Sequence, residues 1–217
     1  MDIFHEILKK KRKEFSPQSV LYIQNLRRIK LITRETPNLQ ILLDHGYGDI
    51  GHWICTYFDG NNNHIYDSLN RNSLSAQQEQ YLKCLYPFPF KNVFPQVQQQ
   101  TNQYDCGIYA IAFATTICFN KNPANQIYHI PDMRTHAEQI FLTKTLMEFP
   151  SIPKDWKINR KTKANQFPRS SYQQQKSVSD QLSFQNAKYV INSVIIFQQL
   201  FLFSTQSRRV HQFPKWF

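Results

Sequence analysis

The segment from Cys106 to Cys118, CGIYAIAFATTIC, constrains the fold most because apolar side chains would cover nearly every face of the helix it predicts. A helix at the surface keeps one polar face, whereas a helix of this composition is buried on all sides. Other elements must therefore surround it. Hydrophobic residues make up 41% and aromatic residues 14% of the 217-residue chain, enough for a core of ordinary size, so a wholly disordered chain is excluded.

Short strands are predicted before this helix. The residues from His52 to Phe58 (HWICTYF) and from His64 to Asp67 (HIYD) are separated by DGNNN, and Asp-Gly and Asn tolerate the positive φ of a hairpin turn. We therefore expect two antiparallel neighbours here. Further β-prone pieces lie at 20–23, 29–32, 39–43 and 93–97.

Three more helices are predicted. Apolar residues at i, i+4 spacing indicate a helix over 2–14, and the S-x-x-Q form of a capping box at Ser75 indicates one that ends near Leu85. Asp132 can cap a last helix over 133–148, which Pro150 would end. Helices and strands mix without regular βαβ alternation, so the sequence predicts an α+β fold, a mixed sheet with a central buried helix that begins at Cys106.

The charge distribution divides the chain at residue 150. Residues 151–217 carry 11 Lys and Arg against 2 Asp and Glu, which is +9 of the net charge of +11. We expect a domain over 1–150 and a basic, largely disordered tail over 151–217, with any weak nucleic-acid contact in the tail. The tail's apolar segment at 189–203 is too short and too polar to span a bilayer, so no membrane partner is expected.

The compartment is predicted from the N-terminus and from the cysteines. The start lacks the apolar run of a secretory signal, and four cysteines without CxxC spacing indicate free thiols, so an intracellular location, nuclear or cytoplasmic, is expected. The run KKKRK at 9–13 is either a nuclear-import signal or a solvated helix end, and the sequence leaves both open.

Four residues in a fixed order carry the predicted chemistry: His52, Asp67, Gln100 and Cys106. At a helix start, unpaired N–H groups and the helix dipole favour the thiolate of Cys106. An imidazole takes the thiol proton and returns it to a leaving amine, and a carboxylate fixes the imidazole tautomer, so His52 and Asp67 fit these roles. Gln100 would donate to the oxyanion, together with the backbone N–H of Cys106.

The hairpin sets a condition on this arrangement. Side chains alternate faces along a strand, so His52 and Asp67 share a face only if the turn holds an even number of residues. With Asp59–Asn62 as the turn, Phe58 pairs with Asn63, and Asp67 reaches His52 on the diagonal.

Other interpretations exist for each residue taken alone. Cys106 could be an inert core thiol, as we interpret Cys55, Cys84 and Cys118. Asp67 could cap a turn, Gln100 could be one more polar loop residue, and Trp53 could simply pack in the core. A zinc site built from His52, Cys55 and His64 or Cys84 lacks the paired ligand spacing of structural sites, so we expect no metal and no cofactor.

Three motifs together resemble one family. GHW at 51–53, YDSLN at 66–70 and QTNQYDCGIYAIAF at 100–113 are similar to the ubiquitin-like-protein-specific cysteine proteases, which include the SUMO proteases and relatives such as the adenovirus maturation protease. That family has the order His, Asp, Gln, Cys, with the Gln six residues before the Cys, as Gln100 and Cys106 stand here. The resemblance implies a cysteine-proteinase-like fold and covers most of 1–150 and none of the tail.

The resemblance implies a cysteine-type peptidase or isopeptidase that cleaves after Gly-Gly of a ubiquitin-like modifier, from a conjugate or a precursor. Trp53 would then line the narrow passage over the two glycines. The family often has a second Trp near its N-terminus, and none precedes Trp53 here. A maturation protease of a virus or transposable element, or a catalytically silent modifier-binding module, therefore stays open.

Overall fold

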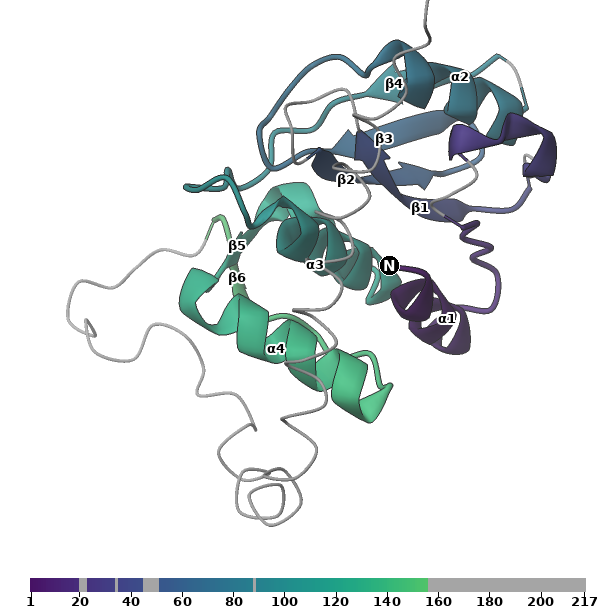
Figure 1. Cartoon of the computed structure of the whole chain (residues 1–217). Helices are drawn as coiled ribbons and strands as arrows, with labels where there is room; N and C mark the ends of the chain where they lie inside the picture. Colours follow the sequence, from purple (N-terminus) through teal and green to yellow (C-terminus); the bar gives the residue numbers. More distant parts are fainter. Residues whose placement is uncertain (20–22, 34, 45–50, 88, 156–217) are drawn as a thin grey trace, which may run out of the picture. The chain divides into compact units, whose positions relative to one another are not determined.

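The computed structural model describes residues 1–19, 23–33, 35–44, 51–87 and 89–155 (Figure 1). They all belong to the first of two compact units, Met1–Pro168, whereas the second unit, Arg169–Phe217, lies outside the described residues. The predicted tail, including its apolar segment at 189–203, therefore falls almost entirely outside them.

A four-stranded mixed sheet forms one layer of the first unit, in the order β1-β2-β3-β4. Strand β2 (His52–Phe58) pairs in antiparallel register with β1 (Asn38–Asp44) on one side and with β3 (Asn62–Tyr66) on the other. Strand β4 (Lys91–Val93) runs parallel to β3. This sheet and the helices packed on it confirm the predicted α+β class.

The hairpin between β2 and β3 has the predicted register. Phe58 pairs with Asn63 across the turn, and the Asp59 carboxylate accepts hydrogen bonds from the backbone N–H groups of Asn61 at 2.9 Å and Asn62 at 2.7 Å. The aspartate thereby holds the backbone of the turn in place, as turn-forming Asp residues do. Strand β3 begins two residues earlier than predicted, so the Asn residues contribute to the ladder as well as to the turn.

Each face of the sheet carries its own apolar core. Ile54 and Phe58 of β2 pack with α2 (Ala76–Leu85), which begins with the predicted capping box of Ser75 and Gln78. On the opposite face Cys55 packs with α3 (Cys106–Cys118), whose bounds are those predicted. Helix α3 lies between the sheet and α4 (Ile130–Thr143), which explains why nearly all its side chains are buried (Figure 1).

The two outer helices are shorter than predicted. Helix α1 (Asp2–Lys11) buries Phe4, Ile7 and Leu8 against α3, and its end at Lys11 falls within the basic run. Helix α4 begins before Asp132 because Pro131 fits the first helical turn. It ends at Thr143, where Lys144 adopts φ 51°, so the predictions of Asp132 as the cap and of an end near Glu148 were wrong.

Two strand predictions need correction, and a third is not tested. Residues 29–32 are not a strand, and the backbone N–H of Ile32 donates to the Leu85 carbonyl outside any sheet. The strand predicted at 93–97 is β4, which ends at Val93, two residues before Pro95. The strand predicted at 20–23 lies mostly outside the described residues.

A second, two-stranded sheet was not predicted. It pairs β5 (Gln126–Tyr128) with β6 (Ser151–Pro153) in antiparallel register. Two short 3-10 helices, η2 (Leu26–Arg28) and η3 (Pro123–Asn125), complete the described elements. Because β6 lies beyond residue 150, the folded part of the chain extends past the boundary drawn from composition.

No helix in the described part of the chain is long and apolar enough to cross a membrane.

Candidate active site

Helix α3 and strand β2 meet where both begin. His52 is the first residue of β2, and the preceding Gly51 has φ +76°, a left-handed conformation that L side chains rarely adopt. A Cβ at Gly51 would lie 3.0 Å from Leu43 Cδ1 and 3.1 Å from the Asp44 carbonyl oxygen. Glycine is therefore required to bring the chain into β2 with His52 in this position.

His52 and Asp67 form a buried hydrogen bond. His52 Nε2 lies 2.6 Å from Asp67 Oδ1, and the two side chains are only 2% and 3% exposed. The β2–β3 ladder ends at Cys55 paired with Tyr66, so Asp67 directly follows β3, in agreement with the predicted register. The backbone N–H of Leu69 also donates to Oδ1, at 2.8 Å, which fixes the carboxylate further.

Cys106 completes a hydrogen-bonded row with these two residues. Its thiol lies at the start of α3 and forms a hydrogen bond with the His52 ring. The structure therefore brings together Asp67, His52 and Cys106 in that order.

The electrostatics of the row favour an ion pair. Burial alone would raise the pKa of the Cys106 thiol, but hydrogen bonds from His52 and from the backbone N–H groups of Trp53 and Gly107 outweigh it and lower the pKa. Burial alone would lower the pKa of His52, but its bonds to Asp67 and Cys106 outweigh that effect and raise it. Both shifts favour a thiolate beside an imidazolium.

Trp53 lies over the start of α3. A Cβ built on Gly107 would be 3.4 Å from Trp53 Cδ1, so the indole ring is close to the residue that follows Cys106. The Trp53 side chain is half-buried and packs against the core on the α3 side of the sheet. Trp53 therefore packs in the core, as the alternative interpretation held, and it also lies beside the residue that follows the thiol.

Gln100 is joined to the residue that follows Asp67. Its backbone N–H donates to the Ser68 carbonyl at 2.9 Å, and the Ser68 hydroxyl donates to Gln100 Oε1 at 2.5 Å. The Gln100 Nε2 group donates one hydrogen to the Asn102 carbonyl at 2.6 Å. These bonds fix which way the amide faces, and they leave the second Nε2 hydrogen as the one that can serve an oxyanion.

The loop before Cys106 is held by side chains that the sequence reasoning did not weigh. Asn102 Oδ1 accepts from the backbone N–H groups of Tyr104 at 2.8 Å and Asp105 at 3.0 Å. Asp105 in turn forms an ion pair with Arg134 of α4. The sequence analysis did not single out Arg134, which anchors this loop to α4.

Arg71 and Asp44 were also missed. Arg71 Nε donates to Asp67 Oδ2 at 2.6 Å, and Arg71 Nη1 donates to Asp44 Oδ2 at 3.2 Å. Asp67 and Arg71 lie outside any helix, so their four-residue spacing gave no signal. Nothing in the sequence pattern pointed to Asp44.

The zinc alternative finds no support in the arrangement of its residues. Cys55 is fully buried in the core that packs on α3, and His64 Nε2 lies 2.9 Å from Asp59 Oδ2. The part of the chain that the structure describes contains no group of three or more His, Cys, Asp or Glu that could hold a metal ion. The four cysteines are free thiols, and Cys84 is exposed rather than part of the core as predicted.

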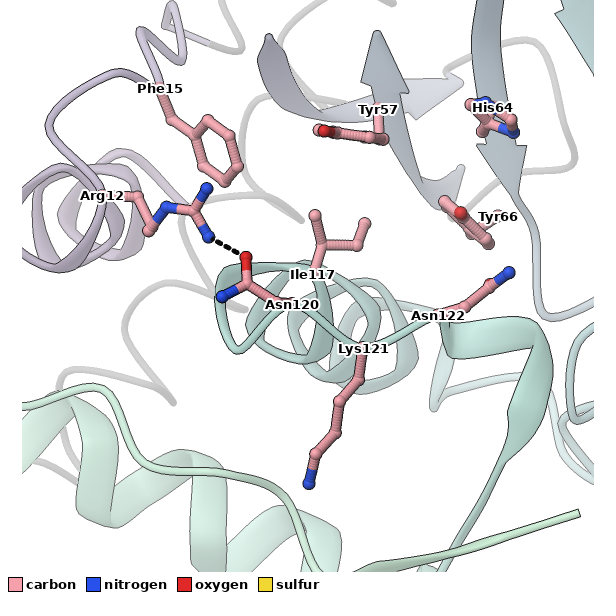
Figure 2. Close-up of a pocket in the computed structure, with 9 residues that line it drawn as sticks. All are labelled: Arg12, Phe15, Tyr57, His64, Tyr66, Ile117, Asn120, Lys121 and Asn122. Carbon is pink, nitrogen blue, oxygen red and sulfur yellow. Dashed lines mark hydrogen bonds between the residues drawn. The ribbon is translucent and has the colours of Figure 1, made fainter. Parts of the chain in front are cut away.

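A separate hollow of about 390 Å³ lies at the opposite end of α3 (Figure 2). Its cations have partners already: Arg12 Nη1 donates to Asn120 Oδ1 at 2.6 Å, and Lys121 points away and pairs with Glu148. Since α3 rises about 1.5 Å per residue, its end at Cys118 is about 18 Å from Cys106. The hollow is lined by Arg12, Phe15, Tyr57, His64, Tyr66, Ile117, Asn120, Lys121 and Asn122.

Comparison with known proteins gives a consistent result. Residues 52–148 match the family model described as the Ulp1 protease family, C-terminal catalytic domain. The SUMO protease Ulp1 with its catalytic cysteine oxidised to a sulfenic acid is a similar solved structure, with 17% identity, a TM-score of 0.50, and coverage of 66% of this chain and 75% of that one. No curated protein sequence matches the chain.

Two further solved structures are similar. The Ulp1 protease domain in complex with Smt3, the yeast orthologue of SUMO, is 18% identical, with a TM-score of 0.48 and coverage of 67% of this chain and 76% of that one. The Ulp1-like SUMO protease catalytic domain of Chaetomium thermophilum is 16% identical, with a TM-score of 0.49 and coverage of 67% and 69%.

The fold, the hydrogen-bonded row and the family match define a cysteine protease, a hydrolase that uses a thiol. More narrowly, residues 52–148 are similar to the catalytic domain of the Ulp1 protease family.

Proposed function

We propose that this chain cleaves after the C-terminal Gly-Gly of a ubiquitin-like modifier, acting as a peptidase on precursors and as an isopeptidase on conjugates. The observation that carries the proposal is the row of Asp67, His52 and Cys106 at the start of α3, with its lowered thiol pKa. The family supplies the substrate class.

Acylation begins at Cys106. The thiolate attacks the carbonyl carbon of the last glycine, a C–S bond forms, and the carbonyl π electrons move onto oxygen. The His52 imidazolium then gives its proton to the leaving amine as the C–N bond breaks. Asp67 holds the ring and stabilises its charge throughout, and the product of this half-reaction is a thioester on Cys106.

Deacylation reverses the roles. His52 takes a proton from water, the resulting hydroxide adds to the thioester carbonyl, and the C–S bond breaks. The modifier leaves as a C-terminal carboxylic acid that loses its proton to solvent, and Cys106 returns to the thiolate beside a protonated His52.

The oxyanion forms next to the first turn of α3. The backbone N–H of Cys106 belongs to the turn whose N–H groups lack intrahelical partners, so it is one donor. The second Nε2 hydrogen of Gln100 is the other. The Ser68 hydroxyl supports this role because it occupies Gln100 Oε1 and so turns the amide donor, rather than the acceptor, towards the site.

Trp53 gives a physical reason for the glycine requirement. Its indole lies beside Gly107 at the start of the nucleophile helix, so a substrate strand that reaches Cys106 must pass close to a flat ring. Residues without side chains fit such a passage. We therefore expect Ala in place of either glycine to slow cleavage far more than changes farther upstream.

The proposal is tested with modifier-derived probes that carry an electrophile after the terminal glycine. A panel built on SUMO, ubiquitin and other modifiers should give a covalent adduct on Cys106 of the full chain, read by mass, with at least one member. Matched probes ending in Ala-Ala should react far more slowly, and Trp53→Ala should narrow that difference. Equal reaction of the wild type with Gly-Gly and Ala-Ala probes would contradict the proposal.

The same panel of probes distinguishes modifier cleavage from the alternative function, that of a maturation protease. A protease that reacts with no modifier probe, yet processes a different peptide through Cys106, would be a maturation protease of viral or transposon type with the same chemistry. Cys106→Ala is the control in both cases because it removes the nucleophile and keeps the fold.

A further inference from the structure

Arg71 lies between two buried carboxylates at the edge of the site. It donates through Nε to Asp67 at 2.6 Å and through Nη1 to Asp44 at 3.2 Å. The side chains of Asp67 and Asp44 are 3% and 5% exposed, whereas that of Arg71 is 20% exposed. A forked, permanently charged guanidinium thus connects two acids that have little contact with water.

The second acid is placed by the strand register. Asp44 is the last residue of β1 and pairs with His52, the first residue of β2. Partners in an antiparallel ladder have Cα atoms roughly 5 Å apart. Asp44, Arg71 and Asp67 therefore surround His52 from the neighbouring strand and from the turn after β3.

These charges act on His52 in opposite directions. The groups that act on the ring are Asp67 and Arg71 from the turn after β3 and Cys106 from α3. Asp44 of β1 pairs with His52 in the ladder, and its carboxylate lies against Arg71. Arg71 keeps Asp67 ionised and oriented, but its positive charge opposes an imidazolium at His52. Asp44 offsets that cost because its negative charge lies against Arg71 on the side of β1.

We propose that Arg71 and Asp44 are positioning residues of the protease site: Arg71 holds the Asp67 carboxylate against His52, and Asp44 balances the Arg71 charge so that the imidazolium is retained. This inference rests on the proposed function for the role of His52. The use of the two Asp67 oxygens supports it, since Oδ2 accepts from Arg71 while Oδ1 stays with His52 and Leu69.

The test is a double-mutant cycle on the full chain, with Arg71→Met, Asp44→Asn and the two combined. The readout is the rate of Cys106 alkylation by iodoacetamide as a function of pH, measured on the Cys106 peptide by mass. Removing the Arg71 charge takes away a repulsion from the imidazolium, and the Leu69 N–H still holds Asp67 Oδ1 at His52, so the lost repulsion should exceed the effect of a looser carboxylate. The alkaline transition, where His52 loses its proton, should therefore move upward by about half a pH unit or more. Asp44→Asn should move it downward, and the double variant should lie between the two.

Two further variants sharpen the cycle. Arg71→Lys keeps the charge and loses the fork, so it should leave the alkaline transition nearly in place while kcat falls roughly tenfold to a hundredfold with little change in KM. Lys121→Met removes a positive charge at the far end of α3, well beyond the screening length of about 8 Å at physiological salt, and should shift nothing.

Opposite shifts from Arg71→Met and Asp44→Asn support the proposal, because a loss of stability cannot produce them. Shifts in the same direction, or none, overturn it. If Arg71→Met does not fold, Asp44→Asn and Arg71→Lys still decide: an unshifted Asp44→Asn profile together with unchanged kcat in Arg71→Lys overturns it. Because alkylation needs no substrate, failure of the modifier probes would refute the proposed function without touching this result.

Discussion

The two ends of α3 each carry a cysteine, and the chemistry of the two thiols differs completely. Cys106 opens the helix, and its pKa is lowered by donors from His52, Trp53 and Gly107 against the effect of burial. Cys118 closes the helix, and burial raises its pKa to about 12, even though Arg12 acts in the opposite direction. Burial by itself therefore makes a thiol inert.

The direction of the helix adds to this difference. The N-terminal end presents unpaired N–H groups and positive potential, whereas the C-terminal end presents carbonyl oxygens and negative potential. At the Cys118 end the nearest cation, Arg12, is already engaged with Asn120, Glu14 and the Cys118 carbonyl. A reactive cysteine on this helix is thus possible only at its start.

The largest difference in cleavage rate is expected between two single variants, Cys106→Ala and Cys118→Ala. Cys106→Ala should lower cleavage by roughly 10⁴-fold or more, because it removes the nucleophile. Cys118→Ala should keep its kcat, and its free energy of unfolding should fall only by the small cost of the cavity left in the core. The measurement is steady-state hydrolysis of a Gly-Gly reporter, with thermal unfolding as the control. Near-normal cleavage by Cys106→Ala would refute the assignment of the site.

A smaller effect is expected from the oxyanion donor. Gln100→Ala should lower kcat about a hundredfold with little change in KM, because one donor to the developing charge is lost. The same reporter assay measures it. A change confined to KM would mean that Gln100 binds substrate rather than stabilises the oxyanion.

The smallest of these effects is expected from Ser68→Ala. The hydroxyl does not touch the substrate and only orients the Gln100 amide, so kcat should fall roughly tenfold, within the range for a hydrogen bond of about 1 kcal/mol. The Gln100→Ala, Ser68→Ala double variant should be no worse than Gln100→Ala alone. If the losses of kcat in the two single variants multiply in the double variant, Ser68 does not act through the Gln100 amide.

The placement of Asp67, His52 and Cys106 side by side was predictable from the sequence because each part depends on local rules. The uniformly apolar segment from Cys106 to Cys118 forced a buried helix with the thiol at its start. The turn Asp59–Asn62 fixed the parity of the hairpin, which put Asp67 on the face of His52. Neither inference needed knowledge of distant parts of the chain.

The rest depended on contacts between distant segments. Asp44 reaches the site only through the pairing of β1 with β2, and the sequence analysis did not predict that these two segments pair. Strands β5 and β6 have three residues each and are more than twenty residues apart, so neither has a local pattern. Residues 29–32 have strand propensity, but their segment packs on other elements instead of joining the sheet.

The most direct test of the account is the alkylation rate of all four thiols in one sample at neutral pH, resolved by peptide mass. The central claim is that the surroundings at the start of α3 activate Cys106. We predict that iodoacetamide labels Cys106 first, that exposed Cys84 follows at the rate of an ordinary thiol, and that Cys55 and Cys118 stay protected. His52→Ala should slow Cys106 to the rate of Cys84 or below. If Cys106 reacts no faster than Cys84 in the wild type, or if His52→Ala leaves its rate unchanged, the account is contradicted.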